Sequence, residues 1–198
     1  MKKFDLVIFD LDGTLLDTLP DVHSCLLKTL EILKLPPVTI EQTKLAIGPN
    51  HQTFAKIALG TGDSEQVNNF FTIFRPIYMQ NCAVQTKPFK GIMETLEKLN
   101  EIKRAVASNK MLKLTESILY QLNLRKKFDL VAGPELVKNP KPDPDMINYC
   151  YKKLGVSPKK TLLVGDTDND ILAARSAGVK SCLAGWGYSN EMERLRRL

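Results

Sequence analysis

The fold of this chain is decided by Asp5-Leu6-Val7-Ile8-Phe9-Asp10-Leu11-Asp12-Gly13-Thr14-Leu15. The segment begins with a short apolar run of strand-forming residues and ends in a polar turn. Such a run is typical of a buried strand in a parallel sheet. Because ligands of open α/β sheets bind at the carboxyl ends of the strands, Asp10 and Asp12 stand where we expect a functional site.

Further strands and helices are predicted along the chain. Similar apolar runs occur at 104–107, 128–132, 161–164 and 180–183. Between them, the spacing of apolar residues predicts amphipathic helices at 91–99, 112–122, 143–154 and 169–177. Strands that alternate with helices form βαβ units with right-handed crossovers. The sequence therefore predicts the α/β class, with a Rossmann-like parallel sheet flanked by helices.

The stretch between residues 18 and 87 contains helical patterns without an intervening strand. One apolar stripe is formed by Val22, Leu26, Leu30 and Leu33. A capping box at Thr39-Ile40-Glu41-Gln42 predicts the start of a second helix. A third helix carries an apolar face formed by Val67, Phe70, Phe71, Phe74, Ile77 and Tyr78. Breaks at Pro36-Pro37 and Thr61-Gly62-Asp63 separate the three helices.

These patterns predict two domains. We expect an all-helical cap domain, residues 17–87, inserted into a core formed by residues 1–16 and 88–198. The charged run at 191–197 predicts a solvated helix at the end of the chain.

The composition is that of a folded domain. Of 198 residues, 43% are hydrophobic and 25% are charged, with a net charge of +6, and a chain of this length buries a core without disulfide staples. No apolar run approaches the roughly 18 residues that span a bilayer, and acidic residues interrupt the stretch that a signal peptide would need. Buried, reduced thiols of a cytoplasmic protein are expected at Cys25, Cys82, Cys150 and Cys182.

Asp10 and Asp12 suit nucleophilic and acid–base chemistry. A simple turn accounts for Asp12-Gly13 but leaves Asp10, directly after an apolar run, unexplained. Two carboxyl groups this close raise the pKa of one of them, so that one stays ionised while its neighbour carries a proton. This division suits a nucleophile beside a general acid or base.

Two later strands also end in polar residues. Ser108-Asn109-Lys110 offers a hydroxyl and backbone N–H groups near a helix start, where phosphate binds, although an ordinary helix cap is an equal alternative. Gly165-Asp166-Thr167-Asp168-Asn169-Asp170 contains three carboxylates in five residues. Capping accounts for Asp168 or Asn169. The remaining carboxylates indicate a hard oxygen site for Mg²⁺.

Lys141 lies between prolines in the segment Lys138-Asn139-Pro140-Lys141-Pro142-Asp143-Pro144. The prolines stiffen the loop and hold the side chain in one direction, whereas a lone lysine is more often a solvated surface charge. Phosphoryl transfer needs a nucleophile, a proton carrier and cations that neutralise the phosphoryl oxygens. The carboxylates, the hydroxyl and the fixed lysine together meet these needs.

The motifs together resemble those of the haloacid-dehalogenase (HAD) superfamily, in particular its phosphoglycolate-phosphatase-like branch with a helical cap. Asp10-Leu11-Asp12-Gly13-Thr14 is similar to the first family motif and Ser108-Asn109 to the second. Lys141-Pro142 is similar to the third motif, and Gly165-Asp166 with Asp170 to the fourth. The resemblance covers nearly the whole chain and implies a phosphatase that acts on a small phosphorylated metabolite.

The resemblance also implies a role for each residue. Asp10 would attack phosphorus and form an aspartyl-phosphate, while Asp12 would protonate the leaving oxygen and then activate water. Lys141 would neutralise charge on the nucleophile and the phosphate. Mg²⁺ would be held by Asp10, the Asp12 backbone carbonyl, Asp166 and Asp170. The phosphoryl oxygens would be bound by Thr14, Ser108 and Asn109, with Ser108 counted among the catalytic residues.

Other functions on the same scaffold stay open. A dehalogenase is disfavoured, because halide leaves without a proton and Asp12 would then have no task. A sugar phosphomutase or a pyrophosphatase would use the same residues. Mutases of this branch carry an arginine in the cap loop near the place of His51, which favours a phosphatase. His51 is itself a candidate substrate-binding residue, with a solvated loop histidine as the alternative.

A nucleic-acid-binding module is the rival from a different class. Such a module would show a basic stripe with interleaved aromatic residues. Arg125-Lys126-Lys127 and Lys159-Lys160 are short and lack aromatic residues. We therefore expect neither a nucleic-acid nor a membrane partner, and either a monomer or a homodimer.

Overall fold

The computed structural model describes residues 3–48 and 51–189. The helix expected at 191–197 lies outside the described residues, as do Pro49 and Asn50 of the loop before His51.

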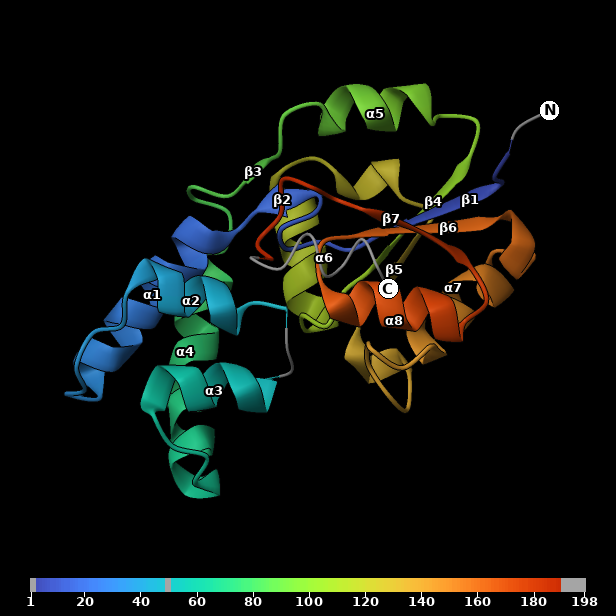
Figure 1. Ribbon diagram of the computed structural model, residues 1–198. Helices are drawn as coiled ribbons and strands as arrows, with labels where there is room; N and C mark the ends of the chain where they lie inside the picture. Colours follow the sequence, from blue (N-terminus) through green and yellow to red (C-terminus); the bar gives the residue numbers. More distant parts are fainter. Residues whose placement is uncertain (1–2, 49–50, 190–198) are drawn as a thin grey trace.

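A parallel sheet forms the centre of the described chain (Figure 1). Its order is β5-β4-β1-β6-β7. The strands are β1 (Leu6–Phe9), β4 (Lys103–Ala107), β5 (Leu130–Ala132), β6 (Thr161–Gly165) and β7 (Lys180–Leu183). All neighbours pair in parallel, and β1 lies in the middle, where both of its faces are buried. This position explains the continuous apolar run in β1 and confirms the predicted fold class.

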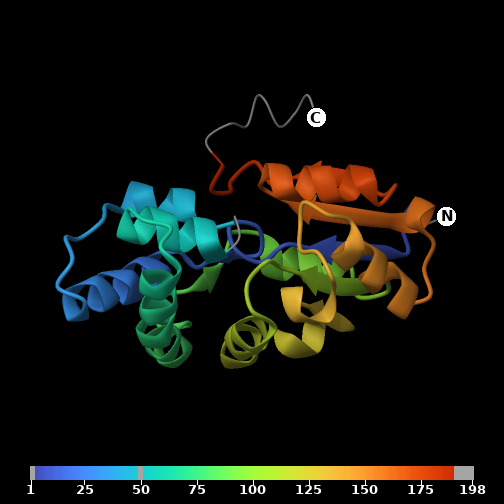
Figure 2. The ribbon, with the colours of Figure 1, turned by 90° about the horizontal axis from the view of Figure 1, so that it is seen from below.

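Helices cover both faces of this sheet (Figure 2). They are α5 (Ile92–Lys98), α6 (Leu112–Gln121), α7 (Asp145–Lys153) and α8 (Asp168–Ser176). Val7 and Phe9 of β1 share one apolar core with α5 and α6, while Leu6 and Ile8 share the opposite core with α7 and α8. The alternation follows from the two-residue period of a strand, which sends successive side chains to opposite faces.

Four further helices are inserted after the first strand and lie together beside the sheet (Figure 1). They are α1 (Leu19–Ile32), α2 (Ile40–Ala46), α3 (His51–Leu59) and α4 (Ser64–Asn81). The predicted capping box at the start of α2 is present. The expectation of three helices is wrong, because the chain ends α2 before Gly48, whose φ of +106° does not fit a right-handed helix.

Two short strands connect this helical insertion to the core. β2 (Leu16–Asp17) and β3 (Lys87–Pro88) pair in antiparallel fashion at its two ends. Asp21, buried in the first turn of α1, accepts hydrogen bonds from the backbone N–H groups of Val84, Gln85 and Thr86 at 2.8–3.0 Å. The outgoing and returning chains are thereby held side by side at the junction.

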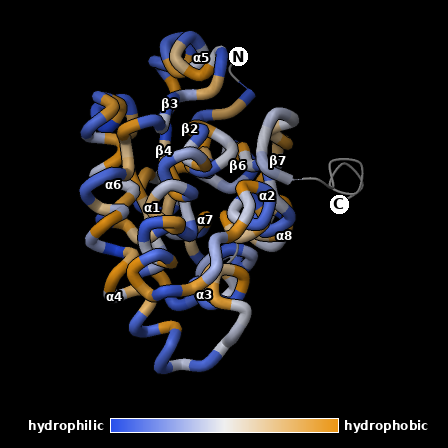
Figure 3. Tube along the Cα trace, turned by 90° about the vertical axis from the view of Figure 1, so that its left-hand side faces the viewer, coloured by the Kyte–Doolittle hydropathy of each residue, from blue (hydrophilic) through white to orange (hydrophobic). Residues whose placement is uncertain are grey.

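Aromatic side chains fill the interior of the insertion. On α4, Phe70, Phe74 and Tyr78 follow one another at four-residue spacing, with ring centroids 5.5 Å apart in each step. Phe54 of α3 packs against Phe74 with centroids 5.2 Å apart. Each such pair contributes about 0.5–1.5 kcal/mol beyond the burial of its area. The hydropathy pattern in Figure 3 shows hydrophobic and hydrophilic positions alternating along α1 and α4, as in amphipathic helices.

The sequence led us to expect buried cysteines and no membrane-spanning segment. Cys25, Cys82 and Cys150 are buried free thiols, but the expectation is wrong for Cys182, which is exposed on β7 at the edge of the sheet. Among the described helices, none combines the length and the apolar character that a bilayer crossing requires.

Candidate active site

Polar side chains gather at the carboxyl ends of three neighbouring strands. Asp10 follows β1, Ser108 follows β4 and Asp166 follows β6, and these strands are adjacent in the order β4-β1-β6. A cavity of about 160 Å³ opens here between the core and the helical insertion. Its core wall includes Asp10, Asp12, Ser108, Asn109, Lys110 and Lys141. Its other wall includes Ile47, His51, Phe71, Phe74, Arg75 and Tyr78.

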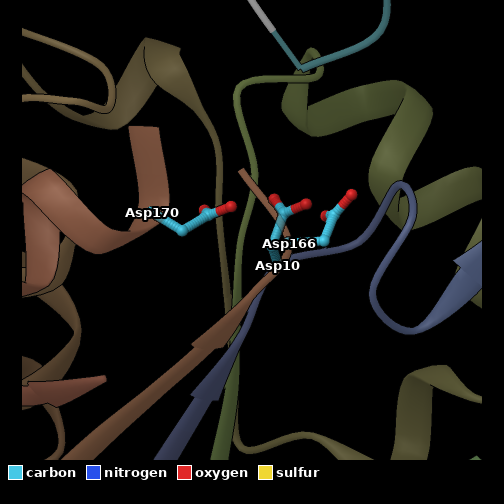
Figure 4. Close-up of side chains that lie close together, drawn as sticks. All are labelled: Asp10, Asp166 and Asp170. Carbon is cyan, nitrogen blue, oxygen red and sulfur yellow. The ribbon is translucent and has the colours of Figure 1, made fainter. Parts of the chain in front are cut away.

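An acidic cluster lies at the base of the site. Asp10, Asp166 and Asp170 each offer a carboxylate oxygen, and these oxygens lie within 4.8 Å of one another (Figure 4). All three side chains are buried. Lys141 Nζ donates to Asp10 Oδ1 at 2.7 Å and to Asp170 Oδ1 at 2.6 Å. The expected lysine is therefore the internal counter-ion of this cluster and no solvated surface charge.

The electrostatics of the cluster follow from burial and mutual repulsion. Burial raises the pKa of Asp10 well above its ordinary value, and Asp170 and Asp166 add to this rise against the opposing charge of Lys141. Burial, followed by the charge of Asp170, raises the pKa of Asp166 to about 6. The pKa of Lys141 is raised, because its two carboxylate partners outweigh the burial that disfavours its charge.

The cluster fits a divalent cation. One lysine stands against three carboxylates, so the ionised cluster carries an excess of negative charge that burial makes costly. The available ligand atoms are oxygens, which Mg²⁺ prefers. The metal site expected from the spacing of the motifs is therefore chemically consistent with the donors that the fold brings together.

Asp166 is held from two sides by neighbouring loops. Thr14 Oγ1 donates to its Oδ1 at 2.9 Å, and the backbone N–H of Tyr188 donates to its Oδ2 at 2.7 Å. A Cβ at Gly13 or at Gly187 would overlap the Asp166 side chain, so both positions require glycine for this close approach. Thr14, expected to bind phosphate, is fully buried, and its hydroxyl orients Asp166.

Asp12 has two polar partners in the described structure. It accepts a hydrogen bond from Thr18 Oγ1 and forms an ion pair with Lys110, whose Nζ lies 3.1 Å from Asp12 Oδ1. Lys110 also donates to Tyr78 Oη at 2.9 Å. Tyr78 belongs to α4, so this contact joins the helical insertion to the residue that follows the second sequence motif.

Asn109 and Ser108 occupy different places in the site. Asn109 donates from Nδ2 to the Lys141 carbonyl at 2.8 Å and accepts from the Lys141 N–H at 3.0 Å, so it fixes the loop that carries Lys141. Ser108 is buried at the cavity wall, where its hydroxyl accepts from the Lys110 N–H at 3.2 Å. Ser108 and Asp10 therefore both line the cavity. The amide nitrogen and oxygen of Asn109 both bond to the Lys141 backbone.

Further contacts join the two walls of the cavity. The Gly48 carbonyl accepts from Asn169 Nδ2 at 3.1 Å and lies 3.4 Å from Asn109 Nδ2. His51 is exposed at the first position of α3, lines the cavity and packs edge-on against Phe71, with ring centroids 5.8 Å apart. His51 therefore starts a helix at the cavity rim.

Tyr188 links the acidic cluster to the junction with the insertion. Its hydroxyl accepts from the backbone N–H groups of Thr18 and Leu19 at 2.7 and 2.9 Å and donates to Asp17 Oδ1 at 2.9 Å. Its own N–H holds Asp166. One residue therefore contacts both a predicted metal ligand and the segment through which the chain enters α1.

Among the cavity-lining residues that the sequence did not assign to the site are Lys110, Tyr78 and Arg75. The signal for Lys110 was its place directly after Ser108-Asn109. The sequence placed Tyr78 on the apolar face of a helix. Its hydroxyl was the available signal, because a buried hydroxyl usually has a polar partner. Arg75 lies on the same helix and stacks on Phe71, with its guanidinium carbon 4.9 Å from the ring centroid, which no sequence pattern indicated.

Comparison with known proteins agrees with this geometry. The family model described as "Haloacid dehalogenase-like hydrolase" matches residues 7–184. The chain is 39% identical over 185 residues to the phosphoglycolate phosphatase of Aquifex aeolicus, covering 92% of this chain and 85% of that protein. It is 31% identical over 193 residues to the N-acetylmuramic acid 6-phosphate phosphatase of Pseudomonas aeruginosa, covering 95% and 85%.

A solved structure gives the same result. The crystal structure of a predicted phosphoglycolate phosphatase from Haemophilus somnus has a TM-score of 0.89 and 29% sequence identity. The similarity covers 96% of this chain and 89% of that one. The matched span includes the acidic cluster, Ser108 and Lys141. The chain therefore belongs to the haloacid dehalogenase-like hydrolase family.

Proposed function

We propose that this protein is a Mg²⁺-dependent phosphatase that hydrolyses a small phosphomonoester, of the type exemplified by 2-phosphoglycolate. The observation that carries the proposal is the placement of Asp10 at the cavity wall. There its carboxylate lies 2.7 Å from Lys141 and shares a cluster with Asp166 and Asp170. Its similarity to two phosphatases, which extends over 92% and 95% of this chain, supports the same conclusion.

The first step uses Asp10 as nucleophile. An Asp10 carboxylate oxygen attacks phosphorus, the bond to the leaving oxygen breaks, and an aspartyl-phosphate forms. Asp12 gives a proton to the leaving oxygen, so that the product leaves as a neutral hydroxyl. Lys141 stays paired with Asp10 and balances the charge of the attacking carboxylate.

The second step returns the enzyme to its starting state. Asp12, now ionised, takes a proton from a water molecule, whose oxygen attacks phosphorus and displaces the Asp10 carboxylate as phosphate forms. Ser108 lines the cavity beside Asp10, and we assign its hydroxyl to a phosphoryl oxygen. Thr14 and Asn109 serve the same reaction indirectly, by holding Asp166 and the Lys141 backbone.

The acidic cluster would hold the metal ion. We assign its ligands to the carboxylates of Asp10 and Asp166 and the backbone carbonyl of Asp12, with Asp170 in support. When bound, a divalent cation draws negative charge from the phosphoryl oxygens. Asp170 also accepts from Thr167 Oγ1 at 2.7 Å and from Lys141, which fixes its orientation in the cluster.

Residues 17–87 would act as a cap over a core formed by residues 1–16 and 88–198. The apolar wall that the insertion contributes limits access of water to the aspartyl-phosphate. Polar contacts between the two parts include Asn169 with Gly48 and Lys110 with Tyr78. One buried apolar cluster also extends across both parts.

The test is phosphate release from a panel that includes 2-phosphoglycolate, sugar phosphates, nucleotides and pyrophosphate. Wild-type protein with Mg²⁺, wild-type protein with EDTA and the Asp10→Asn variant are compared, with Asp143→Asn as an exposed control. We expect metal-dependent release that Asp10→Asn abolishes and Asp143→Asn retains. Release that survives Asp10→Asn would exclude Asp10 as nucleophile. Isomerisation of a sugar phosphate, or release from pyrophosphate alone, would favour a mutase or a pyrophosphatase.

A further inference from the structure

Lys110 is a cavity-lining cation that the proposed mechanism does not use. Its side chain is 11% exposed, and its Nζ contacts Asp12 and Tyr78 at 3.1 and 2.9 Å. It also lies over the ring of Tyr78, 4.7 Å from the centroid. A positive charge with so little access to solvent is costly unless it has partners. Its position beside the proposed proton donor makes it a candidate for contact with the substrate.

Hydrogen-bonding capacity remains in this pair. An ammonium group has three donors, and among the described residues its polar partners are Asp12 and Tyr78. Tyr78 Oη accepts from Lys110, which leaves the phenol proton for another acceptor. Burial and the charge of Asp12 raise the pKa of Tyr78 well above its ordinary value, so the phenol keeps that proton. An ammonium donor and a hydroxyl donor are therefore available side by side.

The other cations of the cavity are less suited to a ligand. Lys141 is already paired with two buried carboxylates. Arg75 is exposed and stacks on Phe71, and exposure weakens an ion pair through solvent screening. Lys110 combines low exposure with a free donor, which is the arrangement that makes a charged hydrogen bond selective.

Lys110 also lies where the leaving part of a phosphoester would lie. Asp12 must reach the oxygen that joins phosphorus to the leaving group, and Lys110 contacts Asp12 directly. Apolar residues make up the neighbouring wall, including Val22, Phe74, Met111 and Leu114. Beside these apolar residues, a short leaving group would meet the polar pair formed by Lys110 and Tyr78.

We propose that Lys110 and Tyr78 form a subsite for an acidic group on the leaving part of the substrate, so that short phosphoesters of hydroxy acids are preferred over neutral ones. This inference rests on the proposed phosphatase function. It assigns the preference to a residue pair that joins the core to α4.

The kinetic test compares 2-phosphoglycolate with ethyl phosphate, in which a methyl group replaces the carboxylate. We expect the ratio of the two kcat/KM values to fall about 10- to 100-fold in Lys110→Met and about 2- to 10-fold in Tyr78→Phe. Lys113→Met, the same change at an exposed position on α6, should leave the ratio unchanged. Arg75→Met tests a second cation of the cavity wall.

Binding provides a readout that does not depend on turnover. By titration calorimetry, wild-type protein should bind 3-phosphonopropionate more tightly than propylphosphonate, and Lys110→Met should abolish the difference. Equal loss of activity on both esters in Lys110→Met would show that Lys110 acts only through Asp12 and would overturn the subsite. A loss of activity in Arg75→Met that affects 2-phosphoglycolate but not ethyl phosphate would also overturn the subsite, if Lys110→Met shows no such loss.

The proposed function and the subsite can fail separately. A wild-type protein that hydrolyses no ester of the whole panel, yet prefers 3-phosphonopropionate through Lys110, would refute the phosphatase function and uphold the subsite. Hydrolysis of both esters with equal analogue affinities would refute the subsite alone.

Discussion

Lys141 Nζ lies 2.7 Å from Asp10 Oδ1, although 131 residues separate the two in the sequence. The contact is possible because β1 lies centrally in the sheet and Asn109 fixes the backbone of the Lys141 loop on both sides. Lys141 also pairs with Asp170, so one cation holds the carboxylate that follows β1 and a carboxylate in the first turn of α8.

Removal of this cation should destabilise the fold in a pH-dependent way. Lys141→Met leaves Asp10 and Asp170 without their counter-ion, and loss of one partner from a buried pair costs about 3–5 kcal/mol. We expect the free energy of unfolding to fall by this amount near pH 8 and by less near pH 5, because burial raises the pKa of Asp10 and favours its uncharged form at the lower pH. Chemical denaturation at both pH values measures the effect, with exposed Lys138→Met as control. Equal losses in the two variants would contradict the assignment.

A single methyl group at Gly187 should displace Asp166. Its Cβ would overlap the Asp166 side chain, whereas a Cβ at Gly62 would meet open space. We expect Gly187→Ala to raise the Mg²⁺ concentration needed for half-maximal phosphate release about 10- to 100-fold, the usual range for disturbed metal-site support. Gly62→Ala is the matched control and should match wild type. An unchanged Mg²⁺ requirement in Gly187→Ala would argue against Asp166 as a ligand.

Stability of the metal-free protein should fall as the pH rises. The pKa of Asp166 is about 6 in the folded protein, against an ordinary 3.8, so between these values the folded state binds more protons than the unfolded state. By linkage, the free energy of unfolding then decreases with pH, by about 3 kcal/mol once the pH exceeds 6. Denaturation in EDTA from about pH 4 to pH 7 measures this slope. Asp166→Asn should flatten it, and a slope unchanged by Asp166→Asn would refute the explanation.

His51 at the cavity rim should affect substrate binding more than chemistry. We expect His51→Ala to raise KM about 2- to 10-fold, the range for loss of one neutral hydrogen bond, with a smaller change in kcat. Gln52→Ala is the control, because Gln52 is exposed beside it and is not among the residues that form the cavity wall. An unchanged KM in His51→Ala would leave His51 without a role in binding.

Much of the fold was predictable because hydrophobic periodicity reports burial. The apolar runs at 104–107 and 161–164 became β4 and β6, which pair with β1 on either side. The pair β2 and β3 was not predicted, because each strand has two residues and a two-residue period needs a longer run to be visible. The break between α2 and α3 falls at Gly48, in the loop expected before His51, but the helix that His51 begins was not predicted.

The convergence of Asp10, Lys141, Asp166 and Asp170 was predictable from topology, since the ends of parallel strands meet at one edge. The hydrogen-bond partners of the smaller polar residues were not predictable from topology. Thr14, expected to bind a phosphoryl oxygen, is buried and donates to Asp166, a contact that depends on how the loop after β1 meets the end of β6. Sequence also gave no means to pair Lys110 with Tyr78, because that contact depends on how α4 packs against the core.

The contacts of Tyr188 limit how the helical insertion can be transplanted into another core. The residue lies in the last described loop of the core, yet its hydroxyl holds Asp17, Thr18 and Leu19, where the helical insertion begins. A chimera built by cutting only at the two connecting strands would separate this entry segment from the tyrosine that fixes it. Transplantation of the insertion into another core therefore requires a residue equivalent to Tyr188 far away in the recipient sequence.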